Sequence, residues 1–264
     1  MGNTKLIKLA SGITCEIKEF SGKHQRLLSQ QRSGSINATN LDEVLADIVE
    51  SVGNVKVITV DFVRNMLQVD RKKILLEARQ FMVEGSDFEK EYIHTFSYVS
   101  ATSGKPTEHK VTANLSEGFP TKSIKSYDKD GNLVEQDYAE DYSAINREIE
   151  VLLPKSKRTV VWTRLSGIGE ALASKLKREE KNSHAWVNMR NPKVLTKTKE
   201  SVIPIKLNLD DTHPIDIAFL EKSIKEIEGS VDSEVQFEHP ERDGKLEVID
   251  LSLEMGFFYL SGAI

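Results

Sequence analysis

The chemistry available to this chain depends first on its six histidines, because imidazole is a common general base and the commonest protein ligand for metals. No two of them form a His-x-x-x-His or His-Glu-x-x-His motif, the spacings that place two imidazoles on one helical face. Two could meet across a predicted hairpin, as a solvated pair or as metal ligands, and the solvated pair is the simpler interpretation. The pattern therefore predicts no bound metal. The histidines are His24, His94, His109, His184, His213 and His239, and the hairpin pair is His94 with His109.

Two glycine-containing segments have residue types that bind ions in other proteins. Asp128-Lys129-Asp130-Gly131 resembles the start of a calcium loop, but no glutamate follows at the required end, and Asp-Gly is typical of a turn between strands. Ser166-Gly167-Ile168-Gly169 precedes a predicted helix, as a phosphate-binding loop would, but lacks the Gly-Lys-Ser/Thr ending. We therefore expect turns at both places, no cofactor and no small-molecule substrate.

The densest basic zone runs from Lys193 to Lys199. Acidic residues flank it and no aromatic side chain lies within it, so it lacks the stacking platform of a single-stranded nucleic-acid site. The formal net charge of −5 gives no global attraction to nucleic acid or to an anionic membrane. We expect neither as a partner.

Cys15 is the only cysteine of the chain. It stands at an apolar position of an alternating segment, which favours a buried structural thiol over a nucleophile. One thiol excludes an intrachain disulfide and a cysteine-rich zinc site. No group of residues has the spacing of a catalytic centre, so we expect no enzyme.

The composition is that of an ordinary globular protein, with 264 residues of which 39% are hydrophobic and 29% charged. This length can form one large core or two small ones. The longest apolar stretches are far shorter than the roughly 20 residues that span a bilayer, and the first residues lack the apolar core of a signal peptide. We therefore expect folding in a cytosol and no membrane contact.

Two stretches of the chain, about half its length apart, resemble each other. Residues 14–22 and 159–167 both alternate apolar and polar side chains, reach Ser-Gly and enter a helical pattern, at a constant offset of 145. Asp70 and Asp216 each open a predicted helix, and Asn114-Leu115-Ser116 has an echo in Asp250-Leu251-Ser252. Matches in the same order at nearly fixed spacing predict an internal duplication.

The expected fold class is α+β, with two related α/β units that each consist of a β-hairpin followed by helices and further antiparallel strands. The first unit is predicted at residues 1–116 and the second at 149–264, with a connecting β-hairpin or linker at 117–148. Strand pairs are expected within 5–20, 92–115, 149–162 and 235–251, helices at 22–31, 41–52 (with Asn40 as N-cap), 61–67, 70–83, 169–177 and 214–227, and a charged loop with some helix at 178–201.

Several of these segments carry a resemblance to a known family. They are Leu9-Ala10-Ser11-Gly12 through Phe20-Ser21-Gly22, the helix from Asp70, and their counterparts Leu152-Leu153-Pro154 through Leu165-Ser166-Gly167, Asp216 through Asp232, and Gly256-Phe257-Phe258-Tyr259. In these segments and their order the chain resembles the baseplate proteins of contractile-tailed bacteriophages. Some of those proteins have zinc-ribbon-like cysteine pairs at hairpins that correspond to residues 95–109 and 239–244, where this chain has no cysteine.

The resemblance implies a structural component of a phage tail baseplate, assembled in the host cytoplasm and retained in the virion. Its partners would be other phage tail or baseplate proteins. The alternative is a tail or baseplate assembly chaperone that is not retained in the virion. A third interpretation, an enzyme built from dispersed acidic residues, would require a close cluster of buried carboxylates with strongly shifted pKa values.

Phe257, Phe258 and Tyr259 are the candidate interface residues. Adjacent side chains on a strand point to opposite faces. We therefore expect one of Phe257 and Phe258 to fill the core of the second unit and the other to face a neighbouring subunit. The alternative is that both rings belong to the internal core.

Overall fold

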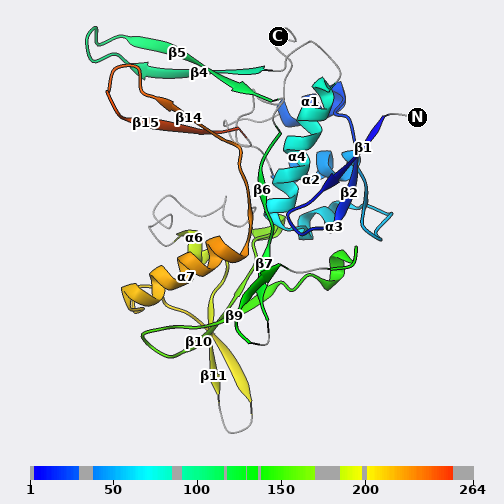
Figure 1. Cartoon of the computed structure of the whole chain (residues 1–264), viewed down its shortest axis with the longest axis vertical. Coiled ribbons are helices and arrows are strands. Elements are labelled where there is room, and N and C mark those ends of the chain that lie inside the picture. Colours follow the sequence, from blue (N-terminus) through cyan, green and yellow to red (C-terminus); the bar gives the residue numbers. More distant parts are fainter. Residues whose placement is uncertain are drawn as a thin grey trace.

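The computed structural model describes residues 3–29, 38–84, 91–115, 118–128, 130–135, 138–169, 185–197 and 201–251. The fold is a mixture of helices and several antiparallel sheets, which confirms the predicted α+β class. In Figure 1 the first half of the chain forms the upper body, residues 148–227 lie below it, and the last described hairpin (residues 234–250) returns to the upper body. None of the described helices has the length and apolar character that crossing a membrane requires.

The first unit is a small sheet packed against helices. β1 and β2 form the predicted hairpin, and β3 pairs with the other side of β2, which gives an antiparallel sheet of order β1-β2-β3. α4 is the longest described helix, and most of its residues are buried. The elements are β1 (Thr4–Lys8), β2 (Thr14–Lys18), α1 (Gly22–Ser29), α2 (Ala38–Ile48), β3 (Val49–Val52), α3 (Val60–Asn65), α4 (Gln68–Val83), β4 (Glu91–Val99) and β5 (Pro106–Asn114).

The linker holds the two units together through short strands. β6 pairs with β13, and the Ile124 amide donates to the Ala10 carbonyl at 2.9 Å. β7 and β8 form a small hairpin around the turn predicted at Asp128. The linker elements are β6 (Thr121–Lys122), β7 (Lys125–Tyr127), β8 (Leu133–Glu135) and the 3-10 turn η1 (Tyr142–Ala144).

The second unit has a four-stranded antiparallel sheet of order β12-β11-β10-β9. The buried side of α7 packs with one face of this sheet, and α7 has the predicted bounds because Pro214 supplies the first helical residue. The elements are β9 (Glu148–Leu152), β10 (Thr159–Thr163), α6 (Ala185–Asn188), β11 (Lys193–Lys197), β12 (Val202–Lys206), α7 (Pro214–Ile227), β13 (Ser230–Val231), β14 (Glu234–Glu238) and β15 (Leu246–Asp250).

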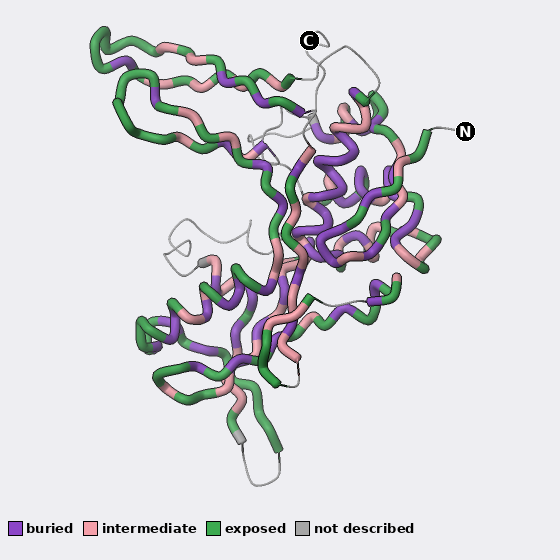
Figure 2. Tube along the Cα trace, viewed as in Figure 1, coloured by how far each residue is buried: buried purple, intermediate pink, exposed green. Residues whose placement is uncertain are grey.

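The chain has two hydrophobic cores, and the residues of the larger core come from both ends of the described chain. The smaller core lies within residues 149–227. The larger core combines the first unit with residues of the linker and with Val231, Ile249 and Leu251 from the C-terminal strands. In Figure 2 the buried parts of the C-terminal strands accordingly lie beside the upper body. The last hairpin of the predicted second unit thus completes the core of the first.

Three local predictions were wrong. Asn40 lies inside α2 and not at its N-cap, and its side chain donates to the Leu27 carbonyl at 2.7 Å. α2 ends at Ile48, because residues 49–52 leave the helix to pair with β2. The segment 178–201, predicted as a loop with some helix, contains the strand β11 as well as α6.

The two halves have their elements in a similar order. Each begins with a hairpin (β1-β2 and β9-β10) whose second strand pairs with a further antiparallel strand (β3 and β11). Each then has a long helix (α4 and α7) and a two-stranded hairpin (β4-β5 and β14-β15). The echo residues Leu115 and Leu251 are both buried in the larger core. This order agrees with the predicted duplication, which stays a prediction.

Candidate functional site

The first place where distant polar residues converge is the N-terminal turn of α4. Asp70 is the third residue of that helix and is fully buried. Its carboxylate accepts a hydrogen bond from the Ser11 amide at 3.0 Å, in the turn of the β1-β2 hairpin, and one from the Tyr142 hydroxyl at 2.8 Å. The Tyr142 oxygen also accepts from the Leu67 amide at 2.9 Å. The linker residue Tyr142 therefore closes the contact between α4 and the hairpin.

The second half repeats this arrangement without the tyrosine. Asp216 is the third residue of α7 and accepts from the amides of Lys155 at 2.8 Å and Ser156 at 3.0 Å, in the turn of the β9-β10 hairpin. Each aspartate thus fastens a helix start to a hairpin turn that lies about 60 residues earlier in the chain.

The two carboxyl groups differ in pKa. Burial raises the pKa of Asp70 above its ordinary range, although the hydrogen bonds from Ser11 and Tyr142 oppose the change. At Asp216 burial also acts upward, but the hydrogen bonds from Lys155 and Ser156 outweigh it, and the pKa lies below its ordinary range. Burial likewise raises the pKa of Tyr142. A buried acidic pair with raised pKa values, such as Asp70 and Tyr142, is typical of a general acid. Here, however, both groups form hydrogen bonds that join α4 to the hairpin turn.

The two units are joined where the Ser-Gly turn of the second meets α4 of the first. Leu67 and Ser166 form an isolated antiparallel bridge, and the Gln68 amide donates to the Leu165 carbonyl at 2.9 Å. A Cβ atom on Gly167 would lie within 2.5 Å of the Arg71 Cζ atom, so the guanidinium occupies the space that a side chain would need. The corresponding Gly22 has no atom near that position. Only the second Ser-Gly turn is used as a joint.

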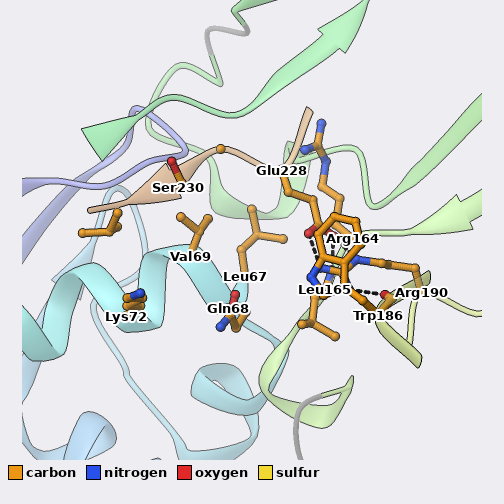
Figure 3. A pocket seen from close by; sticks show the side chains of 12 residues that line it. Leu67, Gln68, Val69, Lys72, Arg164, Leu165, Trp186, Arg190, Glu228 and Ser230 are labelled. Atoms are coloured by element: carbon orange, nitrogen blue, oxygen red, sulfur yellow. Dashed lines mark hydrogen bonds and ion pairs between the residues drawn. The ribbon is translucent and has the colours of Figure 1, made fainter. Parts of the chain in front are cut away.

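A cleft of about 200 Å³ opens beside this joint (Figure 3). On one side, Glu228 accepts hydrogen bonds from the Arg190 Nε atom and the Leu165 amide, each at 3.0 Å, and the Arg190 guanidinium lies 4.0 Å from the Trp186 ring centroid. On the other side, Lys72 pairs with Asp250 at 3.0 Å. Since the Glu228 carboxylate is held by these donors, it is poorly placed to act as a base.

Arg164 lines the same cleft and connects three segments of backbone. Its guanidinium donates to the carbonyls of Asn146 at 2.9 Å and Ile227 at 2.8 Å, and also to the Lys125 carbonyl. Burial lowers the pKa of Arg164. Arg164 therefore holds the linker to the second unit, and the arrangement around the cleft is that of a junction.

Two hairpins, β4-β5 and β14-β15, extend side by side from the upper body (Figure 1). Their facing sides meet through rings: Phe96 lies 5.1 Å from Phe237, and Tyr98 lies 5.1 Å from His239. At the tips, the Glu241 carboxylate accepts from the Ser100 hydroxyl and the Ala101 amide, both at 2.6 Å. The two hairpins therefore form one unit, which we call the paired arm.

The outer faces of the paired arm are apolar in part. Exposed fractions reach 54% at Ile93, 68% at Val99, 57% at Leu246 and 52% at Val248. A third hairpin, β11-β12, leaves the opposite end of the molecule and is mostly exposed (Figure 2). Projecting strands with exposed aliphatic side chains are the surfaces most suited to contact a partner.

The candidate interface residues Phe257, Phe258 and Tyr259 lie outside the described residues. His94 and His109 are on the same face of the β4-β5 hairpin but are not opposite each other, because His94 pairs with Val111 and His109 with Phe96. His109 instead stacks on Phe237 at 5.9 Å. Within the part of the chain that the structure describes, no group of three or more His, Cys, Asp or Glu side chains is arranged to hold a metal ion.

Two other sequence predictions concern turns and a thiol. The Asp128 carboxylate accepts from the amides of Asp130 at 2.9 Å and Asn132 at 2.8 Å, as the turn interpretation predicts. Cys15 is buried, which confirms the structural interpretation, and burial raises the pKa of its thiol. Sequence reasoning missed Tyr142, Arg164 and Glu228, because a single polar residue in a linker, or just after a strand or a helix, carries no pattern.

Comparisons with known proteins give no counterpart: no family model, no curated protein and no solved structure matches this chain.

Proposed function

We propose that this protein is a structural component of a bacteriophage tail baseplate. One observation supports the proposal most: two bodies are joined through buried contacts, and hairpins with exposed aliphatic side chains project from both ends (Figure 1). Such a shape can bridge neighbouring subunits. The sequence resemblance described above supports the same function, with other tail or baseplate proteins as partners and the virion as location.

The paired arm is well suited to such contacts. Its inner face is filled by its own rings and its tips are held by Glu241, so little ordering is left for association to impose. Its outer face presents Ile93 and Val99 between polar residues. Apolar centres with polar surroundings are usual in interfaces between proteins.

Quantitative mass spectrometry of purified particles of the encoding phage tests the proposal. The protein should be present at a fixed ratio to the other baseplate proteins. A matched pair of variants sharpens the test: Ile93→Asp with Val99→Asp should reduce incorporation strongly, whereas Thr95→Asp with Ser97→Asp adds the same charge to the same face and should reduce it less. Equal incorporation of all three proteins would contradict a role of this face in assembly.

A tail or baseplate assembly chaperone is the second candidate function. The same exposed aliphatic residues suit it, because a chaperone also needs surface for its client. Its signature would be a protein found bound to a tail protein in infected cells and absent from purified particles. That result would exclude the structural role and favour the chaperone.

A further inference from the structure

The β11-β12 hairpin has two faces, and no other hairpin among the described residues covers either of them as happens in the paired arm (Figure 1). The register pairs Lys193 with Lys206, Leu195 with Pro204, and Thr196 with Ile203. Because opposite residues share a face and neighbours alternate, Lys193, Lys206, Leu195, Pro204 and Val202 form one face. We call this the lysine face.

The lysine face places two positive charges next to each other on the outer strands of the sheet, two strands away from Glu150 on the same face. Lys193 and Lys206 stand directly opposite each other, and neither forms an ion pair with any described residue. Like charges in direct cross-strand register destabilise a sheet. Residues 193–206 contain four lysines and one glutamate, in a chain whose formal net charge is −5. A ligand with carboxylates would relieve this repulsion.

Both faces of the β11-β12 hairpin also carry exposed aliphatic side chains. Val202 is 52% exposed on the same face, and Ile203 and Ile205 on the other face are 47% and 54% exposed. Val194 continues this other face into the core of the second unit. A ligand of this hairpin should therefore combine apolar side chains with acidic ones.

The hairpin favours contact through side chains and not through its edge. β12 is the edge strand of its sheet, and Pro204 lies in the middle of it. Proline has no amide hydrogen, so a strand added along β12 would lack a hydrogen bond there. A partner would accordingly lie across a face of the hairpin.

Nucleic acid fits this surface less well than protein. No aromatic side chain occurs in residues 193–206 to stack on a base, and the negative net charge of the chain repels a polyanion at longer range. Apolar side chains beside the lysines have no counterpart on a phosphate backbone. A protein segment offers both kinds of group.

We propose that the lysine face binds an acidic, amphipathic segment of a partner protein. The carboxylates of that segment pair with Lys193 and Lys206, and its apolar residues pack on Val202 and Leu195. This inference rests on the proposed function in one respect: the partner is then a tail or baseplate protein.

Nuclear magnetic resonance on the ¹⁵N-labelled full chain tests the proposal. The probe is an octapeptide of alternating glutamate and leucine, compared with a lysine–leucine octapeptide and with a 12-nucleotide oligo(dT). The glutamate peptide should shift the amide signals of residues 193–197 and those of Val202, Ile203, Ile205 and Lys206, and added salt should weaken its binding. The lysine peptide should not bind there.

A charge-reversed variant gives the decisive comparison. Lys193→Glu with Lys206→Glu should raise the Kd for the glutamate peptide about tenfold, which two partly exposed ion pairs account for. The control, Lys105→Glu with Lys110→Glu, makes the same charge change on the β4-β5 hairpin and should leave the Kd unchanged. Thermal unfolding checks that both variants are folded.

Several outcomes would overturn the proposal: equal affinity of the charge-reversed variant, shifts centred outside the hairpin, or preferential binding of oligo(dT). A dimer of the chain that disappears in the charge-reversed variant would also overturn it, since the occupant would then be a second copy. A different result would reject the proposed function. Absence from virions, with peptide binding intact, would reject the structural role and leave the lysine face as inferred.

Discussion

Asp70 and Asp216 occupy the same position in two long helices and hold the same kind of hairpin turn, yet their surroundings differ. Asp70 accepts a hydrogen bond from Tyr142 of the linker and has a raised pKa, whereas Asp216 accepts from two backbone amides of the turn and has a lowered pKa. The Ser-Gly turns differ too, since Gly167 packs on Arg71 and Gly22 lies in open space. In each pair, one residue (Asp216 or Gly22) has contacts within its own unit or none, whereas the other (Asp70 or Gly167) contacts another part of the chain.

Replacing the two aspartates by alanine should give the largest and most unequal effects. Asp70→Ala leaves the Ser11 amide and the Tyr142 hydroxyl without their buried acceptor and should lower the free energy of unfolding by about 3 kcal/mol. Asp216→Ala should cost about 1 kcal/mol, because it removes an acceptor of two turn amides only. Urea unfolding followed by circular dichroism measures both.

The positions of the two tryptophans allow the effect of each aspartate on the second unit to be measured separately. Trp162 and Trp186 both lie in the second unit, so tryptophan fluorescence reports on that unit. Asp216→Ala should move the fluorescence transition more than Asp70→Ala does, relative to the circular dichroism transition. Identical shifts of the two signals in both variants would mean that the units unfold together.

Replacing the two glycines by alanine should give the next largest difference. Gly167→Ala forces a methyl group against the Arg71 guanidinium and should cost about 2 kcal/mol. Gly22→Ala meets no atom and should be neutral or slightly stabilising, since alanine favours the helix that begins there. Thermal unfolding of the two variants tests this pair. A harmless Gly167→Ala would show that the joint can shift.

The aspartates should also give opposite pH dependences of stability. Because the Asp216 pKa lies below the ordinary value of about 3.9, its contribution is present above that pH and is lost as the pH falls through the folded-state pKa. Because the Asp70 pKa is raised, its contribution is full below about pH 3.9 and is lost as the pH rises through the folded-state pKa. Comparing the wild type with Asp216→Asn and with Asp70→Asn between pH 3 and 8 measures both slopes. Parallel slopes would contradict the assigned surroundings.

The smallest effect is expected at the paired arm. Glu241→Gln keeps the shape of the side chain but weakens the hydrogen bonds from Ser100 and Ala101. Global stability should hardly change, while amide hydrogen exchange in the 100–105 turn should become faster. Unchanged exchange there would indicate that ring contacts such as Phe96–Phe237 alone hold the two hairpins together.

Local patterns predicted the elements that have a clear period or boundary. The hairpin at residues 5–20 and the helix Pro214–Ile227 have strict alternation and a proline start, and both are confirmed. β3 was missed because Val49 and Val52 continue the apolar stripe of α2, and only pairing with β2 makes them a strand. β11 was missed because its lysines conceal the alternation.

The contacts between distant segments could not be read in the same way. The offset between Asp70 and Asp216 indicated that the two are equivalent, but not that each accepts from a hairpin turn. Tyr142 and Arg164 act through tertiary geometry, which one sequence does not encode as a spacing.

The larger core has a consequence for the order of synthesis. Ile249 and Leu251 complete a core whose other members lie mostly before residue 146. A ribosome needs on the order of 10 s to add the residues between Leu115 and Ile249. During that interval the apolar residues that Ile249 and Leu251 later cover stay exposed to solvent. They become buried when the last hairpin packs on them. The N-terminal half is thus synthesised first, but its hydrophobic core is completed only when the C-terminal strands have been synthesised.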